Sequence, residues 1–174
     1  MEVICGSMFS GKTEELIRRL RRALIGRQRV QAFKPTLDRR YHESRITSHS
    51  AQSLEAQAVN DVAALEAALD PETQVVGIDE AQFFGPALVP VVLRLTDRGV
   101  RVVIAGLDLD YRGQPFEPIP YLLALADSIT KLSAVCVVCG GAATRSHRVT
   151  DGDARFAVGG ADTYEARCRV CSVL

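Results

Sequence analysis

The segment Gly6-Ser7-Met8-Phe9-Ser10-Gly11-Lys12-Thr13 decides the fold of this 174-residue chain. It matches the pattern G-x-x-x-x-G-K-[ST], in which two glycines let the backbone curl and point its N–H groups at phosphate oxygens. The lysine of this pattern reaches the β- and γ-phosphates of a nucleoside triphosphate, and the final hydroxyl ligates Mg²⁺. We therefore predict that residues 6–13 form a phosphate-binding loop (P-loop).

The stretches on either side of this loop predict the elements that hold it. Residues 2–5 form a short apolar run, which is typical of a buried strand. A helix is predicted over residues 13–25 and ended by Gly26, because its apolar residues share one face: Leu16, Ile17, Leu20, Ala23 and Leu24. The positive end of this helix would face the same phosphates as the loop.

Further apolar runs continue the alternation of strands and helices along the chain. We predict strands at residues 29–34, 74–79 and 100–107, of which the last is the most apolar. Strands that alternate with helices indicate a parallel sheet covered on both faces. The predicted fold class is therefore α/β.

Two helices are expected between these strands. One covers residues 61–69, with Asn60 as its cap, and the other covers residues 86–98 and ends at a left-handed Gly99. Residues 35–50 are polar and lack periodicity, so we predict a long loop there.

The pattern changes near residue 133. Beyond Cys136 the chain has short polar stretches, glycine pairs and a hairpin-like Asp151-Gly152-Asp153, but no long apolar helix. We predict an α/β unit over residues 1–133 and a small β-rich module over residues 134–174.

Composition excludes several classes of protein. Lys and Arg together number 21, as do Asp and Glu, so no net charge attracts the chain to nucleic acid or to an anionic membrane. No apolar run is long enough to span a bilayer, and no secretory signal is evident, so we expect a cytoplasmic protein. The basic run Arg18, Arg19, Arg21 and Arg22 is interpreted as a solvated or subunit-facing helix face.

Two carboxylates follow the predicted strand Val75-Val76-Gly77-Ile78. Ligands of parallel sheets bind at the carboxyl ends of the strands. Asp79 suits the Mg²⁺ side of a bound nucleotide, whereas Glu80, on the turn beyond, suits proton transfer from the group that attacks the γ-phosphate. The alternative is that Glu80 is a surface acid. If it acts on water the protein is an ATPase, and if it acts on a hydroxyl the protein is a kinase.

Four of the five cysteines form two C-x-x-C pairs, Cys136/Cys139 and Cys168/Cys171. Two such pairs supply four thiolates in a tetrahedral array, which suits a structural Zn²⁺ with no open position for catalysis. The spacing between the pairs is longer than usual, which indicates a substantial loop between them. Redox pairs or unrelated buried thiols are the alternatives, and Cys5 is interpreted as a small apolar core residue.

Taken together, these motifs resemble the thymidine kinases of the small P-loop-plus-zinc type. The resemblance covers nearly the whole chain and rests on six fragments in the same order, at residues 2–13, 34–41, 77–83, 106–116, 122–139 and 158–164. It implies a RecA-like P-loop sheet with flanking helices, joined to a small zinc-ribbon module whose loop covers the substrate. It also implies transfer of the γ-phosphoryl group of ATP, with Mg²⁺, to the 5′-hydroxyl of thymidine.

The resemblance assigns roles to particular residues. Glu80 would accept the proton, and Thr13 and Asp79 would lie on the Mg²⁺ side. The expected ATP and phosphate set is Gly6, Ser7, Met8, Phe9, Ser10, Gly11, Lys12, Thr13, Arg40, Asp79, Glu80, Ala81 and Gln82. The expected thymidine set is Met8, Phe83, Leu107, Tyr111, Phe116, Ser146, Ala157, Val158, Gly159, Gly160 and Tyr164.

The resemblance further implies a homotetramer that is inhibited by thymidine triphosphate and binds neither nucleic acid nor membranes. Three positions depart from the usual family residues: Ser7 replaces proline, Tyr111 replaces phenylalanine and adds a hydroxyl, and Ser146 replaces threonine. The rival hypotheses are a nucleic-acid-dependent ATPase with a zinc ribbon and a nucleotide-binding regulator without catalysis.

Overall fold

A six-stranded parallel sheet forms the centre of the computed structural model, which describes residues 1–37, 45–47, 53–150 and 160–173. Its strand order is β5-β2-β6-β7-β1-β8. The strands are β1 Glu2–Gly6, β2 Val30–Pro35, β5 Gln57–Val59, β6 Val75–Ile78, β7 Arg101–Gly106 and β8 Ser128–Leu132. This arrangement confirms the predicted α/β fold with a parallel sheet.

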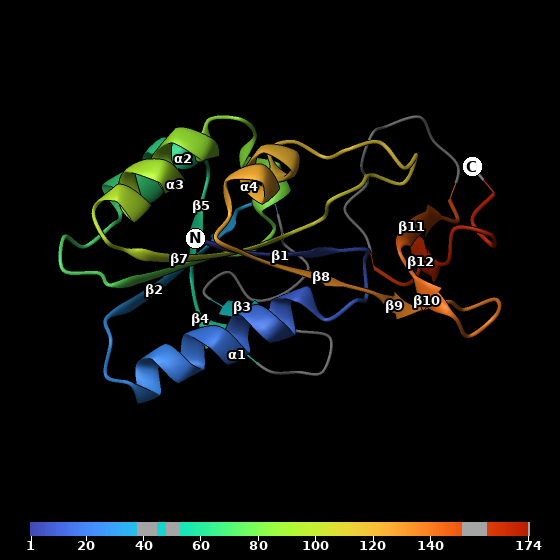
Figure 1. Ribbon diagram of the computed structural model, residues 1–174, viewed down its shortest axis with the longest axis horizontal. Coiled ribbons are helices and arrows are strands. Elements are labelled where there is room, and N and C mark those ends of the chain that lie inside the picture. The colour runs from blue at the N-terminus through green and yellow to red at the C-terminus, as the bar shows by residue number, and fades with distance from the viewer. Residues whose placement is uncertain (38–44, 48–52, 151–159, 174) are drawn as a thin grey trace.

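Helices cover both faces of this sheet, as Figure 1 shows. On one face lies α1 Lys12–Ile25, next to a hairpin of β3 Arg45–Thr47 and β4 Ser53–Glu55. On the other face lie α2 Val62–Ala67, α3 Leu88–Asp97 and α4 Ile119–Leu125. A 3₁₀ turn, η1 Ala81–Phe84, follows β6. None of the helices in the described ranges has the length and apolar character needed to cross a membrane.

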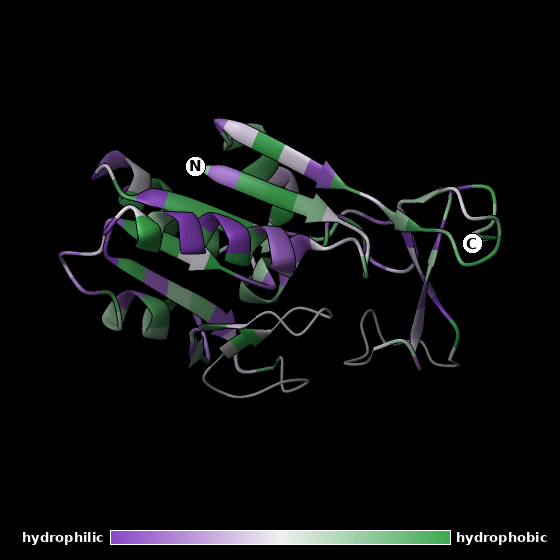
Figure 2. Ribbon diagram, turned by 90° about the horizontal axis from the view of Figure 1, so that it is seen from below, coloured by the Kyte–Doolittle hydropathy of each residue, from purple (hydrophilic) through white to green (hydrophobic). Residues whose placement is uncertain are grey.

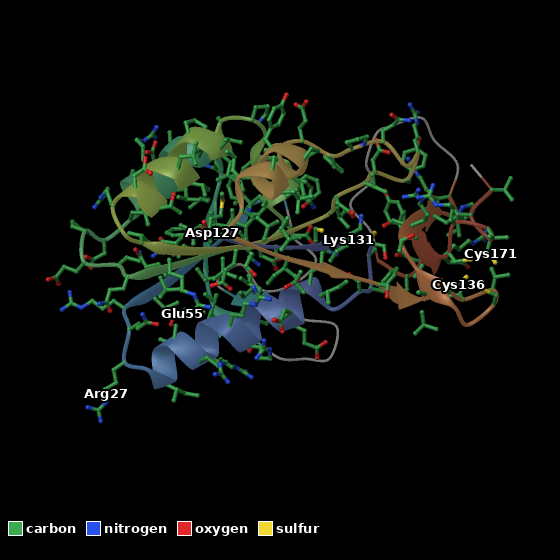
Figure 3. The ribbon with its side chains drawn as sticks, in the orientation of Figure 1. Arg27, Glu55, Asp127, Lys131, Cys136 and Cys171 are labelled. Carbon is green, nitrogen blue, oxygen red and sulfur yellow. The ribbon has the colours of Figure 1, made fainter. Side chains whose placement is uncertain are left out.

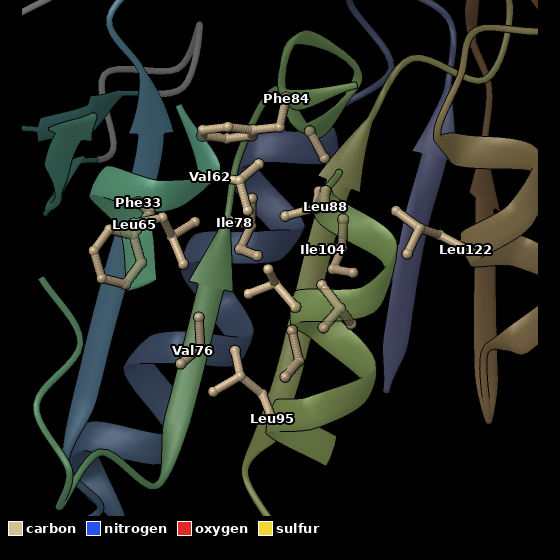
Figure 4. Packing of buried hydrophobic residues seen from close by; sticks show 14 of the residues in the cluster. Phe33, Val62, Leu65, Val76, Ile78, Phe84, Leu88, Leu95, Ile104 and Leu122 are labelled. Carbon is tan, nitrogen blue, oxygen red and sulfur yellow. The ribbon is translucent and has the colours of Figure 1, made fainter. Parts of the chain in front are cut away.

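Two apolar clusters separate the helices from the sheet. Alternating strand residues serve the two faces, so Val76 and Ile78 pack toward α2 and α3, as Figure 4 shows, whereas Val75 packs toward α1. The helical face predicted for α1 is the face that is buried, except for Leu24, which is half exposed. The sheet is therefore packed against helices on both faces. This packing holds in place the loops that follow the carboxyl ends of its strands.

The chain beyond β8 forms a small antiparallel unit. It contains the pairs β9 Ala134–Val135 with β10 Ala142–Ala143, and β11 Arg145–Arg148 with β12 Tyr164–Arg167. Figure 2 shows these strands beside the end of the parallel sheet, and not in it. Their buried residues form a separate apolar cluster against which Phe9 packs. We call residues 134–173 the cysteine module.

The predicted elements occur with shifts of one or two residues at most ends, and Gly99 is left-handed with φ +81°. The predicted cap of α2 was wrong. Asp61 caps the helix, accepting a hydrogen bond from the Ala64 N–H at 2.8 Å, whereas the Asn60 side chain accepts one from Thr36. The helix is also shorter than expected.

Two further differences concern weakly patterned segments. The stretch predicted as a loop contains β3, because Ile46 is buried against α1. Strands β5 and β8 and helix α4 are additions to the predicted elements. The predicted hairpin at Asp151-Gly152-Asp153 lies outside the described residues.

The basic face of α1 is more than a solvated surface. Arg19 is largely buried, and its guanidinium contacts Glu15 at 2.8 Å and Glu2 at 2.7 Å. Glu2 also pairs with Arg101 at 2.6 Å. Arg19 therefore joins α1 to Glu2 at the start of β1. This corrects the interpretation of Arg19 as part of a solvated or subunit-facing surface.

Candidate active site

Residues 6–13 form a tight loop between β1 and α1. Gly6 has φ +143°, and a Cβ at this position would lie 2.3 Å from the Leu132 carbonyl oxygen. Phe9 and Gly11 also have positive φ, of 64° and 85°. These values curl the loop back on itself, so that the Lys12 ammonium donates to the Ser7 carbonyl at 2.7 Å. Only glycine fits at position 6, as the motif predicts.

The loop contains an unused polar group. Within the part of the chain that the structure describes, the Ser10 hydroxyl is buried and has no hydrogen-bond partner. A buried hydroxyl without a partner costs free energy unless a ligand satisfies it. Its position in a loop of this shape fits an anion such as phosphate.

The acidic pair lies beside the start of α1. The Thr13 hydroxyl donates to Asp79, with Oγ1–Oδ2 and Oγ1–Oδ1 distances of 3.0 and 3.3 Å. Asp79 is almost completely buried. A hydroxyl and a carboxylate at this distance are hard oxygen ligands, which fit Mg²⁺.

The chain turns at Glu80, two residues after β6 ends at Ile78. The Glu80 backbone is left-handed, with φ 48° and ψ 42°, and its N–H donates to the Asp79 Oδ1 at 3.0 Å. Its carbonyl accepts the Phe83 N–H and so starts the 3₁₀ turn. Glu80 therefore lies on a turn and not on an extension of β6.

Several residues of the expected thymidine set are brought together in pairs. The Phe83 and Phe116 rings meet edge to face, with centroids 6.2 Å apart. The Met8 N–H donates to the Ser146 Oγ at 3.0 Å, although the two residues come from opposite ends of the chain. The second contact places a polar group of β11 against the P-loop.

Tyr111 has partners that the sequence did not reveal. The Arg112 Nε donates to its hydroxyl at 2.8 Å, which answers the need for a partner. The guanidinium carbons of Arg112 and Arg148 both lie 5.3 Å from the centroid of its ring. Arg148 is opposite Tyr164 in the β11–β12 register, so Tyr111 is linked to the cysteine module.

The module contacts the P-loop directly. The Ser7 hydroxyl, which stands where the resemblance expects proline, donates to the Ala143 carbonyl at 3.1 Å and is buried. Together with the contact between Met8 and Ser146, this joins residues 7–9 to β10 and β11. Serine in place of proline at position 7 therefore adds a hydrogen bond between the P-loop and the cysteine module.

The four paired cysteines converge. Their sulfur atoms all lie within 4.8 Å of one another, and Sγ of Cys139 is 3.7 Å from Sγ of Cys168. Zn–S bonds of about 2.3 Å in a tetrahedron place sulfurs about 3.8 Å apart, so the group fits a structural zinc. Figure 3 shows Cys136 and Cys171 at the end of the molecule opposite Arg27. Hydrogen bonding from the Cys168 backbone lowers the pKa of the Cys136 thiol to about 6, which favours the thiolate that a metal needs.

Not every expected site residue can be placed. Arg40, Ala157, Val158 and Gly159 lie outside the described residues. Tyr164 is the first residue of β12, and its N–H donates to the carbonyl of Gly160, which precedes the strand. Ala81 is buried in η1. Leu107 follows β7, and its N–H donates to the Gln82 side chain. The hydrogen bond between Gln82 and Leu107 and the contact of Arg148 with the Tyr111 ring were not predicted, because both join segments far apart in the sequence.

Comparison with known proteins agrees with this arrangement. A sequence model described as thymidine kinase matches residues 1–172. A thymidine kinase of Bdellovibrio bacteriovorus is 55% identical over 169 residues, covering 97% of this chain and 83% of the relative. Thymidine kinases of Deinococcus radiodurans and Deinococcus deserti are 56% and 54% identical, covering 95% and 100% of this chain and 86% and 94% of the relatives. The chain belongs to the thymidine kinase family.

Proposed function

We propose that this protein transfers the γ-phosphoryl group of ATP to the 5′-hydroxyl of thymidine. The single observation that carries this proposal is the contact of Thr13 with Asp79 at the mouth of the P-loop, with Glu80 on the adjacent turn. It joins a phosphate site to a pair of adjacent acidic residues, Asp79 and Glu80. Family membership supplies the nucleoside as the acceptor.

The phosphates of ATP would be held by the loop residues Gly6 to Thr13. Backbone N–H groups, the Lys12 ammonium and the unused Ser10 hydroxyl supply donors for them. Thr13 and Asp79 would hold Mg²⁺, which neutralises charge on the transferring group. Arg40 and Ala81 complete the proposed nucleotide set.

Glu80 would accept the proton of the 5′-hydroxyl. As that proton leaves, a bond forms between the 5′-oxygen and the γ-phosphorus, and the bond from that phosphorus to the bridging oxygen of ADP breaks. The products are thymidine monophosphate and ADP, with the proton on Glu80.

Thymine has a flat apolar face and a methyl group. Phe83 and Phe116 offer ring surfaces for that face, and Met8, Leu107 and Tyr111 lie on neighbouring segments. Ser146, Gly160 and Tyr164 bring polar and backbone groups from the cysteine module. Ala157, Val158 and Gly159 are proposed to continue this wall as a loop over the base.

The remaining proposals concern organisation. Residues 1–133 would form the ATP-binding unit and residues 134–174 a structural zinc module that anchors both ends of the substrate loop. We also expect a cytoplasmic homotetramer that thymidine triphosphate inhibits.

The anchoring role of the zinc module can be tested by removing the metal. Chelation of the zinc should weaken thymidine binding, and an unchanged affinity for thymidine would contradict the anchoring role.

The test is a phosphotransferase assay across the four deoxynucleosides and their ribose counterparts, repeated with single-stranded DNA in place of nucleoside. Thymidine-dependent formation of a monophosphate supports the proposal. ATP consumption that depends on DNA would instead support the rival ATPase, and ATP binding without any product would support a regulator. Glu80→Gln should lower turnover by about 10²-fold or more while ATP still binds.

A further inference from the structure

Gln82 spans the gap between Glu80 and the next strand of the sheet. Its Nε2 donates to Glu80 Oε2 at 2.5 Å, and its Oε1 accepts the Leu107 N–H at 3.0 Å. Glu80 follows β6 and Leu107 follows β7, which are paired in the sheet. One side chain therefore joins the proposed proton acceptor to the carboxyl end of a neighbouring strand.

The two contacts determine the orientation of the amide. A backbone N–H can only donate, so the Gln82 oxygen must face Leu107. The NH₂ group must then face Glu80, where a carboxylate oxygen accepts. Gln82 is 3% exposed, so water does not compete freely for these bonds.

The neighbouring backbone leaves room for this arrangement. A Cβ at Gly106 would lie 2.9 Å from the Gln82 Oε1 and 2.7 Å from the Ile119 Cδ1. Any larger residue at 106 would push the amide away from its position. The site of the Gln82 side chain is thus built by β7 and α4 as well as by its own turn.

We propose that Gln82 is a positioning residue that holds the Glu80 carboxylate in place for proton transfer. The inference rests on the proposed role of Glu80 and differs from the expectation that Gln82 contacts the nucleotide. Glu80 lies on a left-handed turn, where its backbone alone leaves the side chain several rotamers. The Gln82 amide selects one of them and ties it to the rigid sheet.

Two substitutions separate the contacts. Gln82→Met removes both hydrogen bonds at similar volume. Gln82→Glu keeps an acceptor for the Leu107 N–H but replaces the donor with a like charge beside Glu80. The matched control is Gln57→Glu, an exposed position on β5 away from the P-loop.

The experiment measures kcat, the KM for thymidine and the Kd for ATP, in the wild type and in a Glu80→Gln background. We expect Gln82→Met and Gln82→Glu to lower kcat about tenfold or more, with the Kd for ATP within about twofold. In the Glu80→Gln background the same changes should alter kcat less than about twofold, because the residue acts only through Glu80. Gln57→Glu should match its parent.

Other results overturn the inference. An unchanged kcat, or an equal loss in both backgrounds, means that Gln82 does not act through Glu80. A tenfold or larger rise in the Kd for ATP means that it binds the nucleotide. Thermal unfolding identifies any variant that fails to fold. If Gln82→Met or Gln82→Glu does not fold, the kinetics of the one that folds test the inference. A wild-type protein that phosphorylates no nucleoside, or that keeps its turnover without Glu80, removes the proposed function itself.

Discussion

Ser146 accepts a hydrogen bond from the backbone N–H of Met8 at 3.0 Å, and both residues are buried. Met8 lies in the P-loop and Ser146 on β11 of the cysteine module. The P-loop is therefore held by a unit that is distant in sequence. The Ser7 hydroxyl adds a second bond to the same unit. Nucleotide binding and the order of the module should accordingly depend on each other.

Ser146→Ala should weaken ATP binding as well as stability. The variant leaves the buried Met8 N–H without its partner, which costs about 1–3 kcal/mol. Calorimetric titration with ATP and urea denaturation measure the two effects. Ser128→Ala, at an exposed position on β8, is the control that should change neither. An unchanged Kd for ATP in Ser146→Ala would contradict the link.

Tyr111 should contribute through its ring and not through its hydroxyl. Tyr111→Phe keeps the ring beneath Arg148, so we expect a thymidine KM within about twofold of the wild type. Tyr111→Ala removes the ring and its link to β11, and should raise that KM about tenfold, or about 1.4 kcal/mol. Steady-state kinetics at saturating ATP checks both, and equal effects of the two variants would assign the role to the hydroxyl.

The four clustered cysteines should bind about one equivalent of zinc per chain. Cys168→Ser should lose this metal, because it removes one of the four thiolates. Cys5→Ala is the matched control: burial raises the pKa of the Cys5 thiol to about 11, and the residue lies on β1 in the apolar core between the sheet and helices α2, α3 and α4. Elemental analysis of the purified proteins measures the zinc content per chain. If Cys168→Ser retained its zinc, the four cysteines would not be the metal site.

Short motifs with few physical solutions could be predicted from sequence. The P-loop needs its glycines because a Cβ at Gly6 meets backbone, and the two C-x-x-C pairs converge because a metal needs four ligands. The buried face of α1 could be predicted because the apolar residues on that face recur with the period of a helix, and all of them except Leu24 are buried.

Features that depend on tertiary contacts could not be predicted. Strand β3 has only three residues, so its sequence is too short to show the alternation of a strand, although Ile46 is buried. Strand β8 is an edge strand with exposed residues, and its assignment depends on pairing with β1. Gln82 and Leu107 are 25 positions apart, so no local pattern indicates that they meet.

Glu15 should make stability depend on acid. Hydrogen bonds from Arg18, and then from Arg19, outweigh burial and lower the pKa of its carboxyl from 4.5 to about 2. Because the folded-state pKa is depressed, the contribution is fully present above about pH 4.5 and is lost as the pH falls toward 2. The free energies of unfolding of wild type and Glu15→Gln should thus differ near neutral pH and converge near pH 2. Urea denaturation across this range measures the gap, and a gap independent of pH would show that the ion pairs contribute nothing.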